Sequence, residues 1–199
     1  MPNIAPIILA SSSPYRQQLL SRLGLPFSWL SPELDETPLP GESPSNLVLR
    51  LSAAKARKIS QQHPSAVVIG SDQALENRGE ILGKPGNFDR ACEQLTQLSG
   101  QTVTFLTGLS VQWLAQNISY TDLVTTTVTY RLLGLEQIHR YLEREAPYDA
   151  AGSFKSEALG IALCQRMRSD DPTALVGLPL IRLTDRLLEM GFELFMPKE

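Results

Sequence analysis

The sequence is poor in the residues that mark metal-cluster, redox and membrane proteins. Its 199 residues include only two cysteines, Cys92 and Cys164, and two histidines, His63 and His139. The cysteines form no CxxC pair and no zinc-ligand pattern, so we interpret them as buried free thiols and the histidines as surface residues. No apolar stretch approaches the roughly 20 residues of a membrane span, and we expect no membrane contact and a cytoplasmic location.

The sequence also lacks an excess of positive charge and the common phosphate-binding loops. The net charge is -3 at pH 7, whereas proteins that bind duplex nucleic acid usually present a basic face. We therefore expect no nucleic-acid partner. Neither a GxxxxGK loop nor a GxGxxG loop occurs, so a standard P-loop or dinucleotide site is unsupported. A few local lysines and arginines would still suffice to bind a small anionic substrate.

What the sequence does contain is the pattern of an α/β protein. A hydrophobic fraction of 42% is enough for one well-filled core. Since no internal repeat is present, we predict a single domain over residues 1–199, with one or two lobes. Apolar strand-like runs alternate with amphipathic helical segments. We predict strands at residues 6–10, 27–30 and 67–70, and helices at residues 14–23, 44–62, 87–98, 135–142 and 179–190.

A longer strand pattern follows in the second half of the chain. Residues 103–114 and 118–131 are rich in threonine, valine and aromatic residues, which predicts two antiparallel strands turning near Asn117. A hairpin turn is predicted at residues 77–79, and a short strand is expected near Ile161. Alternating elements combined with an antiparallel pair predict an α/β fold with a mixed sheet flanked by helices, arranged as two lobes around a cleft.

The first candidate site is the predicted turn from strand to helix at residues 10–16. Ser13 suits the N-cap and Pro14 the first helical position. The first N–H groups of a helix have no partner inside it, and the helix dipole adds positive potential there. With Ser11 and Arg16 beside them, these groups predict an anion site, most naturally for phosphate. A plain capped helix with a surface arginine is the simpler alternative.

The second candidate is Asp72, which follows a run of four strand residues at 67–70. In open α/β sheets, ligands bind beyond the carboxyl ends of the strands, where we expect this carboxylate to lie. A carboxylate there can hold a magnesium ion or activate a water molecule. The alternative is an aspartate that caps a turn. Asp35 and Glu36, on the proline-rich acidic loop at residues 31–44, could supply further oxygen ligands.

Two lysines complete the set of candidates. Lys84 lies between Gly83, which permits close approach to a ligand, and Pro85, which fixes the chain. Lys55 lies on the helix that follows the acidic loop. An ammonium group is a compact point charge suited to phosphate oxygens. For either lysine alone, a solvated surface position is the alternative.

Several segments, in order along nearly the whole chain, carry a family resemblance. They are LASSSPYR at residues 9–16, DET at 35–37, the helix with Arg50, Leu51, Lys55 and Ala56, IGSDQ at 69–73, GKP at 83–85, VTFLTG at 103–108, AGSFKSE at 151–157 and LVGLPL at 175–180. In combination these segments resemble the Maf family of nucleotide pyrophosphatases.

The resemblance implies an enzyme that converts a nucleoside triphosphate and water into the monophosphate and pyrophosphate. It also implies a divalent metal, Mg²⁺ or Mn²⁺, an elongated mixed-sheet fold like that of Maf proteins and inosine triphosphatases, and a homodimer. The residues that match the family's motifs have the following implied roles: Asp72 is the catalytic acid group, Ser11, Arg16, Lys55 and Lys84 bind substrate, and Glu36 with Asp72 binds the metal.

The resemblance further implies a base preference. Residues 71–73 and 152–157 resemble the branch of the family that hydrolyses 7-methyl-GTP, and the implied specificity positions are Tyr15, Gln73 and Glu157. The branch that prefers dTTP and UTP usually has other residues where this chain has Gln73 and Glu157. The 7-methyl-GTP branch often has tryptophan in place of Tyr15, so the aromatic face is kept. A dTTP or UTP pyrophosphatase, and a non-catalytic nucleotide-binding regulator of cell division, are the alternative functions.

Overall fold

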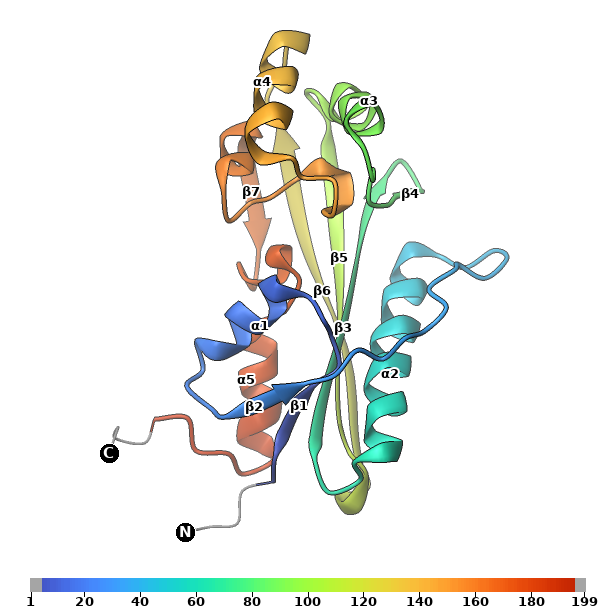
Figure 1. Cartoon of the computed structure of the whole chain (residues 1–199), viewed down its shortest axis with the longest axis vertical. Helices are drawn as coiled ribbons and strands as arrows, with labels where there is room; N and C mark the ends of the chain where they lie inside the picture. Colours follow the sequence, from blue (N-terminus) through green and yellow to red (C-terminus); the bar gives the residue numbers. More distant parts are fainter. Residues whose placement is uncertain (1–4, 196–199) are drawn as a thin grey trace.

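The computed structural model describes residues 5–195, which form an elongated seven-stranded sheet with helices along both of its faces (Figure 1). Residues 1–4 and 196–199, which the predicted single domain includes, lie outside the described residues. The strands are β1 (Ile7–Leu9), β2 (Phe27–Trp29), β3 (Val67–Asn77), β4 (Glu80–Leu82), β5 (Thr102–Trp113), β6 (Ile118–Tyr130) and β7 (Cys164–Ser169). The α-helices are α1 (Pro14–Ser21), α2 (Pro44–Gln62), α3 (Phe88–Leu98), α4 (Leu135–Glu145) and α5 (Leu180–Glu189).

Local capping signals set the starts of three helices. The side chains of Ser13, Ser43 and Asn87 accept hydrogen bonds from the first turns of α1, α2 and α3, and a proline follows each serine. The predicted helix starts are therefore confirmed, because a cap acts within four residues and needs no tertiary contact. Within residues 5–195, no helix is both long and apolar enough to cross a membrane.

The sheet is mixed, as predicted. Its order is β2-β1-β3-β5-β6-β7, with β4 paired to β3. Strand β1 lies parallel to β2 and β3, and all other pairs are antiparallel. The two long strands of the second half are β5 and β6, which pair from Thr102 with Thr129 to Trp113 with Ile118.

The prediction of a short strand near Ile161 is wrong. Residues Leu159–Leu163 form a 3₁₀ helix, in which Ile161 is 53% exposed, and the strand begins only at Cys164. Strand β7 has a largely polar sequence because it lies at the edge of the sheet, where one side meets solvent. Its side chains therefore lack the apolar run by which a buried strand is recognised.

The cysteines and histidines follow the prediction in part. Cys164 and Cys92 are both free, but only Cys164 is buried, and Cys92 is half-buried. Burial raises the pKa of the Cys164 thiol to about 11, so this thiol stays protonated and unreactive at neutral pH. His63 and His139 are exposed, as predicted.

Two clusters of buried apolar side chains occupy opposite ends of the long strands. One cluster packs beneath α3 and α4 and includes Leu75 and Phe105. The other packs beneath α1 and α5 and includes Ile69 and Leu109. We call the end with α3 and α4 the upper lobe, and the end with α1, α2 and α5 the lower lobe (Figure 1). The middle of β3, between Ile69 and Leu75, therefore lies where the two lobes meet.

The edge of β3 has a gap at this meeting point. Strand β1 pairs with β3 only as far as Leu9 and Ile69, and β4 begins to pair at Leu75 and Leu82. Asp72 lies between these pairings, in the middle of β3, where it pairs with Gly108 of β5. The prediction that Asp72 follows the end of its strand is therefore wrong, because β3 continues to Asn77 beyond its apolar run. Asp72 nevertheless lies just past the carboxyl end of β1, where a parallel strand leaves space for a ligand.

Two glycines allow α2 to approach this part of the sheet closely. A Cβ atom at Gly70 would lie 2.3 Å from the carbonyl oxygen of Ser52, and one at Gly108 would lie 2.4 Å from that of Val48. No side chain fits at these distances, so the helix backbone rests directly on the strands. The close approach brings Lys55 of α2 against Asp72 of β3.

Candidate active site

A cavity of about 640 Å³ opens at the gap in the edge of β3. Its volume lies within the range of about 300–1,000 Å³ that is typical of small-molecule sites. Its polar lining comes from both lobes. It includes Ser11, Tyr15, Arg16, Glu36, Lys55, Asp72 and Gln73 from the lower lobe and the middle of β3, and Lys84 and Asp149 from the upper lobe. Thus the structure brings together the predicted site residues except Asp35 and Glu157, which are exposed and do not line this cavity.

The most buried charged side chains of the cavity are those of Lys55 and Asp72. The Nζ atom of Lys55 lies 2.6 Å from Oδ1 of Asp72 and 2.7 Å from Oε1 of Glu36. The side chains of Lys55 and Asp72 are only 6% and 10% exposed, whereas that of Glu36 is 56% exposed. A carboxylate and an ammonium in such a setting interact more strongly than in water, and each needs the other because an unpaired buried charge is costly.

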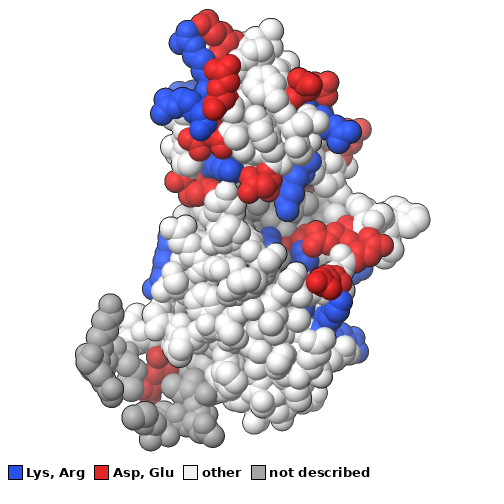
Figure 2. All heavy atoms as spheres, viewed as in Figure 1, with Lys and Arg blue, Asp and Glu red and all other residues white. Residues whose placement is uncertain are grey.

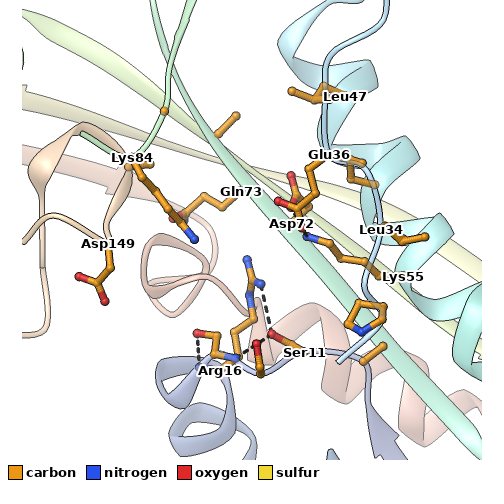
Figure 3. Close-up of a pocket in the computed structure, with 18 of the residues that line it drawn as sticks. Ser11, Arg16, Leu34, Glu36, Leu47, Lys55, Asp72, Gln73, Lys84 and Asp149 are labelled. Carbon is orange, nitrogen blue, oxygen red and sulfur yellow. Dashed lines mark hydrogen bonds and ion pairs between the residues drawn. The ribbon is translucent and has the colours of Figure 1, made fainter. Parts of the chain in front are cut away.

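Arg16 lies on the opposite face of β3 and reaches the same cavity (Figure 3). Its Nε donates to the carbonyl oxygen of Gly177 at 2.8 Å, and its Nη1 donates to Oγ of Ser11 at 3.4 Å. Burial lowers the pKa of Arg16, and the negative charges of Asp72 and Glu36 offset part of this effect. An arginine remains charged at neutral pH in spite of such a shift.

Glu36 is held ionised by the cations around it. Burial on its own would raise its pKa, but the hydrogen bond and charge of Lys55, together with the charges of Lys84 and Arg16, bring the pKa below its usual value. The same three cations surround the middle of the cavity (Figure 3). Lys84 itself is exposed, so its side chain is able to follow a mobile anionic ligand. The arrangement suits a ligand that carries several negative charges, such as a polyphosphate.

A second group of polar side chains joins the two lobes across the cavity. The Oη of Tyr15 donates to Oδ2 of Asp149 at 3.4 Å, and the Nζ of Lys155 lies 3.1 Å from Oδ1 of the same carboxylate. The Lys155 ammonium also lies over the Tyr15 ring, 5.7 Å from its centroid. Burial alone would raise the pKa of Asp149, but the hydrogen bond and charge of Lys155 outweigh it and lower the pKa. One face of the Tyr15 ring is therefore engaged by a cation of the protein.

Gln73 lines the cavity, but its amide nitrogen donates hydrogen bonds to other parts of the protein. Its Nε2 donates to Oγ1 of Thr107 and to the carbonyl oxygens of Ala174 and Leu175, at distances of 2.9–3.1 Å. An amide nitrogen has only two hydrogens, so this group is fully used within the protein. Among the described residues, the Oε1 of Gln73 receives no hydrogen bond, and this oxygen is the atom left for a ligand.

The carboxylates at the cavity match one mode of metal binding. Among residues 5–195, no three His, Cys, Asp or Glu side chains are grouped as metal ligands. Magnesium commonly binds through one or two carboxylates together with substrate phosphates and water. The pair of Glu36 and Asp72 fits that requirement, and it does not provide the four ligands of a structural zinc site. The ammonium of Lys55 is the cation that neutralises this pair in the structure.

Four residues of the site were not predicted: Ser71, Asp149, Lys155 and Gly177. All except Asp149 lie within the segments that carry the family resemblance, but nothing in the sequence indicates that Gly177 contacts Arg16, which is 161 positions away. Asp149 lies two residues after Pro147 and two residues before the segment at residues 151–157. A carboxylate in a proline-bounded turn was the one available signal, and by itself it is weak.

Comparisons with known proteins identify a family and several similar sequences. A family model described as Maf-like protein matches residues 6–190. A protein from Nitrosococcus oceani, named 7-methyl-GTP pyrophosphatase, is 52% identical over 96% of this chain and 98% of its own length. Proteins with the same name from Polaromonas sp. (51% identical; 98% of this chain, 89% of the relative) and Bordetella pertussis (53%; 97% and 96%) are similar. Among solved structures, the Ham1 protein of Staphylococcus aureus matches with a TM-score of 0.43 and 15% identity, over 63% of this chain and 71% of that one.

Proposed function

We propose, since this chain belongs to the Maf-like protein family, that it hydrolyses a nucleoside triphosphate between the α- and β-phosphates, and that 7-methyl-GTP is its preferred substrate. The observation that carries the proposal is the position of Asp72: a buried carboxylate in a nucleotide-sized cavity, with Arg16, Lys55 and Lys84 around it. Relatives that are about half identical over nearly their whole length carry the name 7-methyl-GTP pyrophosphatase.

The cations and the carboxylate would have different roles in the reaction. The bound triphosphate would lie against Ser11, Arg16 and Lys84, whose donors stabilise the negative charge that collects on the leaving pyrophosphate. Asp72 would accept the proton of the attacking water, because it is the carboxylate that the fold holds most firmly in the cavity. The ammonium group of Lys55 would move from Asp72 toward the phosphates as the substrate enters. The products are the nucleoside monophosphate and pyrophosphate.

A divalent cation, Mg²⁺ or Mn²⁺, belongs to the proposal. Glu36 and Asp72 would hold it together with oxygens of the substrate, in the way that magnesium is usually bound in nucleotide sites. When bound, such an ion neutralises phosphate charge and lowers the pKa of coordinated water. The support for the ion is the pair of carboxylates that meet at one ammonium of the protein, Lys55.

The preference for 7-methyl-GTP rests on the other end of the cavity. Guanine carries N–H donors on its Watson–Crick edge, and N7-methylation gives the ring a positive charge. A carboxylate accepts from such donors, and an aromatic face attracts such a cation by about 0.5–2 kcal/mol. The family resemblance implies these roles for Tyr15, which lines the cavity, and for Glu157, which does not line it. Since Lys155 lies over one face of the Tyr15 ring, we expect the base to stack on the other face.

The role of Glu157 has its own test. Glu157→Ala should lower kcat/KM for 7-methyl-GTP more than for UTP, because only guanine offers the donors that this carboxylate would accept. Equal losses on both nucleotides would remove Glu157 from base recognition. In that case Asp149, which does line the cavity, becomes the carboxylate to examine.

The proposed function is tested by the release of pyrophosphate from purified protein with Mg²⁺ or Mn²⁺. The panel contains 7-methyl-GTP, GTP, UTP, dTTP and CTP, and Asp72→Asn is the control variant. We expect the highest kcat/KM with 7-methyl-GTP, and a loss of about 10²–10⁴-fold in the variant, as is usual when a general base is removed. A preference for UTP or dTTP would keep the reaction and overturn the base assignment. Nucleotide binding without turnover would favour a regulatory protein.

Two further parts of the proposal concern the whole molecule. We propose a homodimer and a cytoplasmic location, both from the resemblance to the family. Light scattering on the purified protein tests the first, and cell fractionation tests the second.

A further inference from the structure

We propose that Ser71 and Gly177 are positioning residues for Arg16, which together aim its guanidinium group into the cavity. The inference rests on the proposed function only for the identity of the ligand, a phosphate group. It assigns a task to the segment that follows η4 (Ala174–Val176), which lies more than 150 residues after Arg16 in the sequence.

The guanidinium group is fixed along one side and free along the other. Nε is held by the carbonyl oxygen of Gly177 at 2.8 Å, and Nη1 reaches Oγ of Ser11 at 3.4 Å. Within residues 5–195, Nη2 makes no hydrogen bond. Figure 3 shows this free end pointing into the space between Lys84 and Asp72. A guanidinium group held in this way presents planar donors in one fixed direction, which suits phosphate oxygens.

The carbonyl oxygen of Gly177 reaches Arg16 because of an unusual backbone conformation. Gly177 ends the 3₁₀ helix η4 with a φ of +113°, a region that residues with a side chain rarely adopt. A Cβ atom at this position would lie 3.3 Å from Nε of Arg16. Alanine at position 177 would therefore both strain the turn and crowd the guanidinium group.

Ser71 links this turn to the catalytic strand. Its Oγ is buried and lies 2.9 Å from the carbonyl oxygen of Gly177 and 2.7 Å from that of Gly108. The single hydrogen of the Ser71 hydroxyl is shared between these two carbonyl oxygens, and the Gly177 oxygen also accepts from Nε of Arg16. Since side chains alternate along a strand, Ser71 faces the turn while the adjacent Asp72 faces α2. Because Ser71 and Asp72 are adjacent on β3, the contact between Ser71 and the turn sets the position of Arg16 relative to Asp72.

The turn itself is anchored on both sides of Gly177. Thr107 donates to the carbonyl oxygen of Ala174 at 2.9 Å, and Gln73 donates to those of Ala174 and Leu175. On the other side, Asp171 accepts from the backbone N–H of Ile181 at 2.7 Å. The carbonyl oxygen that receives Arg16 is therefore part of a rigid frame, as the support for a reacting group must be.

A double-mutant cycle separates positioning from a merely structural role. The kcat/KM values of wild type, Gly177→Ala, Arg16→Lys and the double variant are compared for the best nucleotide. We expect Gly177→Ala to lower kcat/KM roughly tenfold or more when Arg16 is present, mainly through kcat, because a misplaced donor stabilises the transition state less. In the Arg16→Lys background, where the guanidinium Nε–H is missing, Gly177→Ala should lower kcat/KM by less than about threefold. Equal losses in both backgrounds would overturn the proposal.

Ser71→Ala is the second variant, because Gly177→Ala could prevent folding. We expect a smaller loss than with Gly177→Ala, roughly threefold, that again disappears when Arg16 is replaced by lysine. A loss that persists in the lysine background would contradict the proposal.

A measurement on the substrate-free protein makes the test independent of turnover. The Nε–H signal of Arg16 in a ¹⁵N NMR spectrum should exchange slowly with water in wild type, and faster in Ser71→Ala. Identical exchange in the two proteins would overturn the proposal. If wild type hydrolyses no nucleotide, the proposed function fails, but this NMR comparison still decides whether Ser71 helps to hold Arg16.

Discussion

The two ends of the cavity are built very differently. At one end, Lys55 and Asp72 form a 2.6 Å contact between side chains that are 6% and 10% exposed. At the other end, Lys155 and Asp149 form a 3.1 Å contact in which the carboxylate is 58% exposed. The first pair is shielded from solvent, where charges interact strongly, and this setting suits the catalytic role proposed for Asp72. In the second pair the Lys155 side chain is only 15% exposed, so it is the carboxylate of Asp149 that meets solvent, which suits the proposed recognition of a base at this end.

The distribution of charge over the molecule follows the same division. Figure 2 shows that acidic and basic side chains crowd the upper lobe and the waist, whereas the lower lobe in this view is largely uncharged. The charged groups of the lower lobe that line the cavity lie at its waist, on α1, the acidic loop and α2. The lower lobe therefore contributes its charged cavity residues from a surface that is otherwise largely uncharged in this view.

The largest expected effect compares the two lysines of these pairs. Lys55→Met leaves the buried Asp72 carboxylate without its main partner, and should lower the free energy of unfolding by on the order of 3 kcal/mol. Lys155→Met removes the partner of an exposed carboxylate, and should lower the free energy of unfolding by less than about 1 kcal/mol. Urea denaturation at neutral pH measures both. Similar losses would show that the two ends do not differ in the way we describe.

A smaller effect is expected on the choice of nucleotide. Tyr15→Leu removes the aromatic face, and should reduce the preference for 7-methyl-GTP over UTP by roughly 3- to 30-fold, which corresponds to the energy of a cation on an aromatic ring. Tyr15→Phe is the matched control, because it keeps the ring and loses only the contact with Asp149. The ratio of kcat/KM values for the two nucleotides is the readout. An unchanged ratio in Tyr15→Leu would exclude stacking of the base on this residue.

The smallest effect concerns an ion pair outside the cavity. The hydrogen bond from Arg50 lowers the pKa of Glu42 from its usual 4.5 to about 2, and the pair ties the acidic loop to α2. Because the pKa is lower in the folded protein, this pair stabilises the fold at pH values above about 4.5 and loses its effect as the pH falls toward about 2. Glu42→Gln should therefore lower the melting temperature slightly at pH 7 and hardly at all near pH 2. An equal difference at both pH values would contradict this assignment.

The lower lobe was the more predictable of the two. Its helices begin at residues whose side chains cap them, such as Ser13 and Ser43, and such signals act over a few residues. The parallel strand β1 and its turn into α1 were likewise readable from an apolar run followed by serines and a proline. The cavity residues Ser11 and Arg16 lie at the turn into α1, where the local pattern predicted an anion site. The burial of Lys55 against Asp72 did not follow from the local pattern, because it depends on the close approach of α2 to Gly70 and Gly108.

Other features depended on contacts between distant segments. The length of β3 was underestimated because Asp72 and Gln73 interrupt its apolar run, although the strand continues on both sides of them. The strand placed near Ile161 belongs three residues later, where polar side chains at the sheet edge conceal it. The frame around Arg16 joins residues 71, 108 and 177, and no local pattern could predict that meeting.

The most direct test of the account follows oxygen from water into the products. Purified protein is incubated with 7-methyl-GTP and a divalent cation in H₂¹⁸O, and the masses of the products are measured by mass spectrometry. Attack on the α-phosphorus, with pyrophosphate leaving, predicts one ¹⁸O atom in the monophosphate and none in pyrophosphate. Label in pyrophosphate, or release of orthophosphate in place of pyrophosphate, would contradict the assignment of this cavity to cleavage at the α-phosphate.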